Sequence, residues 1–244
     1  MNNRNLFKAI GGISDDLIAE TANPVKKIKR LKVIRTAAIA AAVIAALGVT
    51  SVATGVIVGS RTGSSWNIPT YYSLPDSETV KEDIGIDVRL MDSFSSGYTF
   101  KAGFVVDNTD YDTAGSPMRD FKSLDLTYEK DGDDISLSAG PASEWDAERG
   151  EAELSYNGCD IYYTAYANKL VPAGYELTEQ DEADKASGKY VFSYGSNEIQ
   201  ISEVQSVSWS ANGADYCITA IDSTADKATL MSIAEEMIDF GSLS

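Results

Sequence analysis

The stretch QSVSWSANGADYCITAI, residues 205–221, decides the fold class. Val207 and Trp209 alternate with serines before Asn212-Gly213, and Tyr216 alternates with polar residues after it. A period of two indicates strands with one buried face. Asn-Gly between two such runs is a strong hairpin signal, because both central residues of the turn need positive φ. The segment therefore predicts an antiparallel β-hairpin.

The chain before and after this hairpin extends the same pattern. Residues 124–138 predict a hairpin that turns at Asp131-Gly132, and residues 151–166 predict another that turns at Asn157-Gly158. Further strands are predicted at 86–91, 98–106, 190–194 and 198–204. A helix closes the chain, with Ser223 as N-cap, Asp226 as its capping-box acid, and an apolar face of Leu230, Ile233, Ala234, Met237 and Ile238. We expect an α+β domain over residues 85–244: an antiparallel, twisted sheet with the C-terminal helix packed on one face.

Residues 36–60 carry no charge, although the chain on both sides is rich in charge. As a helix this stretch measures about 37 Å, enough to cross a hydrocarbon core of about 30 Å. We expect a single transmembrane helix at 36–60, followed by a linker at 61–84. A cleaved signal peptide with a site at Ser51-Val52-Ala53 is the alternative, but the basic region before the stretch is long for one.

The charges on either side of this stretch predict its orientation. Residues 1–35 hold 8 basic and 3 acidic residues, net +5, whereas residues 61–244 hold 12 basic and 34 acidic residues, net −22. Basic residues stay on the cytoplasmic side, so we expect a cytoplasmic N-terminus and an extracytoplasmic domain in the cell membrane. The acidic domain is not expected to bind nucleic acid. The residues predicted to contact the membrane surface are Lys26, Lys27, Lys29, Arg30, Lys32 and Arg35.

The cytoplasmic segment, residues 1–35, has an apolar helical face but is too short to bury a core of its own. That face must be covered either by lipid, as in an interfacial helix, or by a groove on a cytosolic protein. The residues predicted to bind a partner are Leu6, Phe7, Ile10, Ile13, Leu17 and Ile18.

The side-chain inventory argues against catalysis. The chain has no histidine, which excludes the Ser-His-Asp and Cys-His classes and His-bearing zinc sites. We expect no enzyme, no catalytic residue, no cofactor and no metal. The acidic clusters at 107–112 and 129–134 suggest either calcium or, by default, a solvated surface.

The cysteines and tyrosines leave two further questions. Cys159 and Cys217 form either a disulfide or two separate buried thiols. Tyr162, Tyr163 and Tyr166 form either a ligand-binding strip or ordinary packing across the sheet.

Three stretches of the sequence are similar to a known group of proteins. They are LFKAIGGISDDLIAE at residues 6–20, FKSLDLTY at 121–128, and a C-terminal part with VPAGY at 171–175, YGS at 194–196 and IAEEMI at 233–238. With these the chain resembles uncharacterised single-pass membrane proteins of Gram-positive bacteria that are grouped with anti-sigma-factor-like regulators. The resemblance implies that the inside segment binds a sigma factor while the outside domain senses the envelope. The zinc-type anti-sigma pattern, which needs histidine and a cysteine pair inside, is missing here.

Two functions follow from the sequence. The first is a membrane-anchored regulatory protein whose cytoplasmic helix binds a cytosolic partner, a sigma factor, under control of an extracytoplasmic sensing domain. The alternative is an envelope-anchored binding or structural module with no cytosolic partner, whose basic segment contacts only the lipid bilayer. The sequence does not identify the extracellular ligand.

Overall fold

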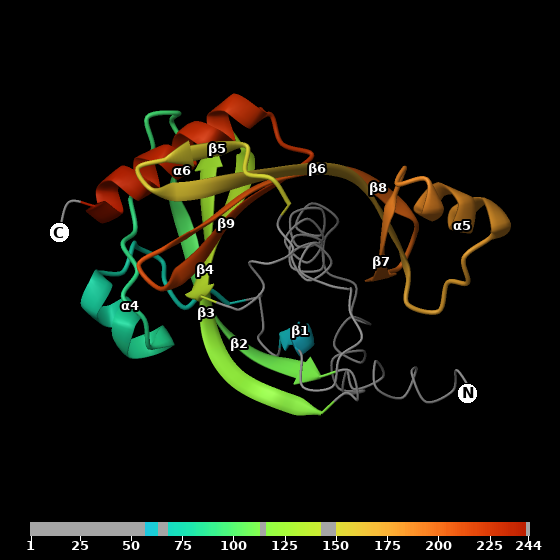
Figure 1. Cartoon of the computed structure of the whole chain (residues 1–244), viewed down its shortest axis with the longest axis horizontal. Coiled ribbons are helices and arrows are strands. Elements are labelled where there is room, and N and C mark those ends of the chain that lie inside the picture. Colours follow the sequence, from blue (N-terminus) through green and yellow to red (C-terminus); the bar gives the residue numbers. More distant parts are fainter. Residues whose placement is uncertain (1–56, 63–67, 113–115, 143–149, 243–244) are drawn as a thin grey trace.

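The computed structural model describes residues 57–62, 68–112, 116–142 and 150–242. The strands in these residues form one sheet in the order β1-β2-β3-β4-β9-β8-β6-β5, with β7 beside β6 (Figure 1). Neighbouring strands run antiparallel, except that β6 and β7 are parallel. The elements are β1 (Ile57–Thr62), α4 (Ser77–Ile84), β2 (Thr99–Asp112), β3 (Pro117–Lys130), β4 (Asp133–Pro141), β5 (Leu154–Tyr156), β6 (Cys159–Pro172), α5 (Glu179–Ala186), β7 (Val191–Ser196), β8 (Gln200–Ala211), β9 (Ala214–Ile221) and α6 (Lys227–Ser242). The predicted α+β class, with an antiparallel sheet and a C-terminal helix, is confirmed.

The three predicted hairpins are present, and their turns have the expected backbone. Asp131-Gly132 joins β3 to β4 with φ of 51° and 84°, Asn157-Gly158 joins β5 to β6 with 46° and 83°, and Asn212-Gly213 joins β8 to β9 with 52° and 79°. Positive φ at both central residues matches the right-handed twist of the strands on either side. These turns set the register of the sheet.

One face of the sheet, called here the helix face, carries the hydrophobic core. Leu126, Leu137, Ile218 and Val207 occupy one row across β3, β4, β9 and β8, and each is at most 1% exposed. α6 covers this row with the side chains that the sequence predicts: Leu230, Ile233, Ala234, Met237 and Ile238 are all buried.

Two further features of the helix face are an aromatic stack and the start of α6. Trp209 stacks on Tyr216 with 5.1 Å between ring centroids. α6 begins one residue after Asp226, whose Oδ1 accepts the N–H of Thr229 at 2.9 Å. Asp226 is therefore the N-cap, in place of the predicted Ser223. Ser223 instead donates to Asp133 at 2.8 Å, which ties the chain before α6 to the β3–β4 hairpin.

The predicted linker at 61–84 contains regular structure. β1 occupies residues 57–62 and pairs with β2, so the last four residues of the predicted transmembrane helix, 57–60, are strand. α4 occupies residues 77–84 and begins after Asp76, which caps its first turn by accepting the Thr79 N–H at 2.8 Å. The helix buries Val80 in the core.

Two predicted strands also differ from the structure. Residues 86–91 are not part of the sheet, although Val88 and Leu90 are buried in the core. Their alternation therefore reflects packing on the helix face and not strand pairing. The predicted strands at 198–204 and 205–210 form the single strand β8.

The part of the predicted span that precedes residue 57 lies outside the described residues. Among the residues that the structure describes, no helix combines the length and the apolar character that crossing a membrane requires.

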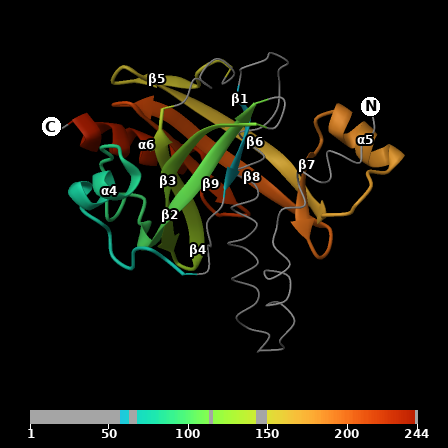
Figure 2. The same ribbon diagram turned by 90° about the horizontal axis from the view of Figure 1, so that it is seen from below.

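α5 lies at the far end of β6 from α6, beyond the part of the sheet that α6 covers (Figures 1 and 2). It joins β6 to the parallel strand β7. A helix at residues 179–186 is not among the elements expected from the sequence. β9 lies in the middle of the sheet, between β4 and β8, although it is the last strand of the chain.

Candidate functional site

The sheet face opposite α6 is lined with hydroxyl side chains and is called here the hydroxyl face. One row across five neighbouring strands consists entirely of serine and threonine; its members, in register, are Thr127, Ser136, Thr219, Ser206 and Thr164. The adjacent row is also polar, and its members are Asp125, Ser138, Cys217, Ser208 and Tyr162. Alternation places these residues here, because side chains along a strand point to opposite faces in turn and the flanking residues lie on the helix face.

The side chains of these rows form contacts both between strands and within one strand. Ser138 Oγ donates to the Cys217 carbonyl at 3.3 Å, and Cys217 Sγ lies 3.7 Å from Thr219 Oγ1. Ser136 and Thr219 are each 6% exposed. Hydroxyl groups both donate and accept, so this arrangement suits uncharged polar groups and offers no metal-binding charge apart from Asp125.

Asp125 is the exceptional residue of the hydroxyl face. It is 6% exposed, and its Oδ1 has no hydrogen-bond partner among the described residues. Burial raises the pKa of its carboxyl to about 7, because the charged form is poorly solvated there. The buried hydroxyl of Tyr166 also has no partner there, and burial raises its pKa. Asp125 is therefore a carboxyl group that gains or loses its proton near neutral pH.

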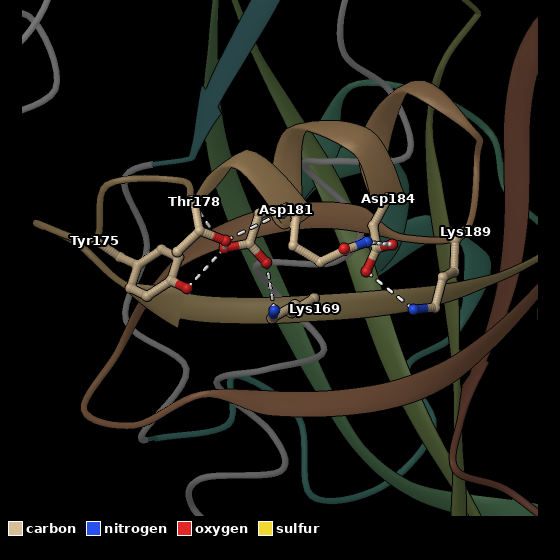
Figure 3. Close-up of polar contacts among 7 residues, drawn as sticks. Lys169, Tyr175, Thr178, Asp181, Asp184 and Lys189 are labelled. Carbon is tan, nitrogen blue, oxygen red and sulfur yellow. Dashed lines mark hydrogen bonds and ion pairs between the residues drawn. The ribbon is translucent and has the colours of Figure 1, made fainter.

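A second polar cluster holds α5 against β6 (Figure 3). Lys169 Nζ lies 2.5 Å from Asp181 Oδ1, while Tyr175 and Thr178 donate their hydroxyls to Asp181 Oδ2 at 2.8 and 2.7 Å. The Thr178 Oγ1 in turn accepts the N–H of Asp181 at 3.1 Å, which completes a capping box. Lys169, then Thr178 and Tyr175, hold the pKa of Asp181 far below its usual value.

The same helix is fixed at its other end by a second carboxylate. Asp184 accepts from Gln180 at 2.8 Å and from Lys189 at 3.0 Å, and these bonds, above all the one from Lys189, lower the pKa of Asp184. Both carboxylates of this cluster, Asp181 and Asp184, are paired with a lysine, Lys169 or Lys189. These pairs explain why α5 stays on β6. The cluster is a structural network.

In each of the two acidic clusters, for which calcium binding and a solvated surface were the alternatives, one aspartate forms contacts that stabilise the fold. In the first, Asp110 is 2% exposed and forms an ion pair with Arg119 at 2.9 Å. In the second, Asp133 accepts from Tyr98, Ser223 and Thr224 at 2.7 to 2.8 Å. Among the described residues no group of three or more aspartate, glutamate or cysteine side chains is arranged to hold a metal ion.

No disulfide joins Cys159 to Cys217. Cys159 alternates in step with Ile161 and packs against the core on the helix face. Cys217 alternates in step with Thr219 and lies in the second row of the hydroxyl face. Of the two alternatives, the structure shows two separate, half-buried thiols, because the sheet lies between them.

The three tyrosines of β6 do not form one strip. Tyr163 lies on the helix face, where it packs against the core and donates to Gln205 at 2.8 Å. Tyr162 and Tyr166 lie on the opposite face, because side chains alternate along a strand.

The residues predicted to bind a cytosolic partner and the membrane surface all lie outside the described residues. They are Leu6, Phe7, Ile10, Ile13, Leu17, Ile18, Lys26, Lys27, Lys29, Arg30, Lys32 and Arg35. These assignments stay predictions.

Sequence reasoning missed Asp125 and the Lys169–Asp181 pair. The capping-box pattern of Thr178 and Asp181 is visible in the sequence and signals a helix start at 179. Asp125 carries no such signal: alternation places it on the polar face, and its burial depends on tertiary structure.

Comparisons with other proteins do not add a candidate. No protein-family model matches the chain, and neither curated proteins nor solved structures give a match.

Proposed function

We propose that the chain is a membrane-anchored regulatory protein. Residues 1–35 lie in the cytosol and bind a sigma factor through the predicted apolar face, and the sheet domain lies outside as the sensing part. The hydroxyl face, where Asp125 Oδ1 has no partner among the described residues, is the surface of that domain most suited to respond to its surroundings.

The observation that carries this proposal is the position of β1. The uncharged stretch that begins at Thr36 continues into β1, which pairs with β2 from Ile57↔Asp112 to Thr62↔Asn108. The uncharged residues before the strand, 36–56, still measure about 31 Å as a helix, close to the thickness of a hydrocarbon core. No separate linker lies between them and the sheet. With residues 36–56 as the span, a movement of β1 in the sheet would reach it without an intervening linker, and this favours regulation over passive anchoring.

Orientation is the first test. Intact cells that make the full chain, tagged at the C-terminus, are treated with protease and then fractionated without detergent. We expect the tag to be removed from intact cells and the untreated chain to sediment with membranes. Retention of the tag, or recovery of the untreated chain in the aqueous fraction, would contradict the proposal.

Partner capture is the second test. The full chain is purified in neutral detergent from its native cells, with Ile13→Asp and Leu17→Asp made together as the test variant. The control variant carries Asn5→Asp and Ala19→Asp, which add the same charge on the opposite side of the predicted helix. We expect a sigma factor to be captured by the wild type and the control but not by the test variant. Capture of lipid alone by all three chains would support the alternative of an envelope-anchored module.

A further inference from the structure

β7 has an open edge. Among the described residues it pairs with β6 alone, from Asn168↔Val191 to Val171↔Tyr194. A strand directs the N–H and C=O groups of alternate residues to opposite sides, so half of those in β7 point away from β6. Such an edge is a template on which another extended segment can pair.

β7 lacks the side chains that commonly protect an edge strand, and its pairing with β6 shifts register only at its end, between Val171 and Pro172. Natural edges are commonly blocked by charged side chains, above all lysine, or by proline. β7 reads VFSYGS and contains neither. Its position is nevertheless well fixed: Ser193 Oγ donates to Asn168 Oδ1 at 2.8 Å within the buried part of the lobe, and Lys169 lies over the Phe192 ring at 5.5 Å.

A large side chain of β7 itself is exposed. Tyr194 is 47% exposed and lies beside Val171 of β6. A strand added to β7 would therefore place its side chains next to Tyr194 and cover apolar surface that now faces solvent.

The negative charge around β7 determines which kind of segment can pair with its open edge. The α5 lobe, taken as residues 173–199 together with Lys169, holds six acidic and three basic residues, net −3. Two of the basic residues, Lys169 and Lys189, are already bound to Asp181 and Asp184. A second copy of this chain, with net charge −17, is repelled. A basic extended segment is attracted.

From these observations we propose that the open edge of β7 binds an extended basic peptide segment of a partner protein by strand addition, with apolar side chains of that segment packing on Tyr194. This mode gives affinity through main-chain hydrogen bonds and selectivity through alternate side chains. The inference does not depend on the orientation of the chain in the membrane or on its cytosolic partner.

The test uses the full chain in uncharged detergent and an eight-residue capped peptide that alternates lysine with valine. Two comparison peptides are used: one alternates glutamate with valine, and one is the lysine peptide with proline at both central positions. Binding is measured by fluorescence anisotropy, and hydrogen exchange of the 190–197 segment is followed by mass spectrometry. We expect only the lysine peptide to bind and to slow β7 exchange, by about tenfold, since a new hydrogen bond must break before exchange.

Tyr194→Lys places a positive charge at the edge and should weaken binding by at least about fivefold. Tyr72→Lys is the matched control, because Tyr72 is a 74% exposed tyrosine in the segment before α4 and has no place in the proposed surface. Binding that leaves β7 exchange unchanged, equal binding of the proline peptide, or equal losses in both variants would overturn the proposal. So would a dimer in the absence of peptide that Tyr194→Lys dissociates, because the edge would then belong to a second copy.

Discussion

Replacing Asp125 with asparagine should stabilise the protein at neutral and alkaline pH. The pKa of this carboxyl is 3.8 in an ordinary environment and about 7 in the fold, where burial disfavours its charged form. A shift of about 3 units corresponds to about 4 kcal/mol at 1.36 kcal/mol per unit. Because the folded pKa is raised, the folded state binds more protons than the unfolded state between the two values. Stability is therefore lost as pH rises from about 4 to about 7.

Asparagine keeps the shape of the side chain but cannot ionise. Its amide remains a buried polar group without a full set of partners, at a cost of about 1–3 kcal/mol. The expected net gain in the free energy of unfolding at pH 8 is therefore about 1–3 kcal/mol. Near pH 4, where the native carboxyl is protonated and has no ionisation cost, the gain should turn into a loss of about 1–3 kcal/mol. The wild type minus variant difference isolates this residue, because carboxylates with lowered pKa, such as Asp181, affect both proteins equally.

The assay is urea unfolding of the full chain in neutral detergent at several pH values, followed by near-ultraviolet circular dichroism of the stacked Trp209–Tyr216 pair. A gain of 2 kcal/mol moves the midpoint by about 1 M when the slope is about 2 kcal/mol/M. Asp131→Asn is the control: Asp131 is exposed in the β3–β4 turn, and asparagine tolerates its φ of 51°. The reasoning is refuted if Asp125→Asn and the wild type lose stability in parallel between pH 4 and 8.

Two further substitutions test the packing and the α5 network. Gly103→Ala should destabilise the protein by about 1–3 kcal/mol, because the new Cβ would lie 2.8 Å from Leu126 Cδ2 and 3.0 Å from the Tyr71 ring; the urea midpoint measures it, and an unchanged midpoint would contradict it. Asp181→Asn should speed hydrogen exchange in α5 by at least about tenfold while leaving α6 unchanged, because Lys169 loses its partner. The pKa of Asp181 is lowered, so wild-type protection of α5 should persist above pH 4 and fall as pH drops below that value.

The sequence predicts the central sheet well because its signals are local. The three turns carry Asp-Gly or Asn-Gly, and their flanking runs alternate, so register and burial follow from neighbouring residues. The apolar face of α6 follows from its period in the same way. The N-cap was misplaced because Ser223 and Asp226 both precede the helix, and only the tertiary bond from Ser223 to Asp133 distinguishes them.

The candidate sites depend on contacts between distant parts of the chain. Asp125 belongs to an alternating strand like any solvent-facing polar residue, so its raised pKa reflects burial that no local pattern encodes. Cys159 alternates in step with apolar residues and Cys217 in step with polar ones, so the sequence already indicates different faces. The sheet places the two thiols on opposite faces. α4 was missed because its eight residues carry one short apolar pair, Val80 and Ile84, within a polar stretch.

The central place of β9 has a consequence for biosynthesis. β1 to β4 form one half of the sheet and β5 to β8 the other, and only β9 pairs with both. A ribosome has to deliver residues 214–221 before the two halves can join. A premature stop before residue 214 leaves both halves without the strand that pairs with each of them, so it should behave as a loss of the whole sheet although the other strands have been made.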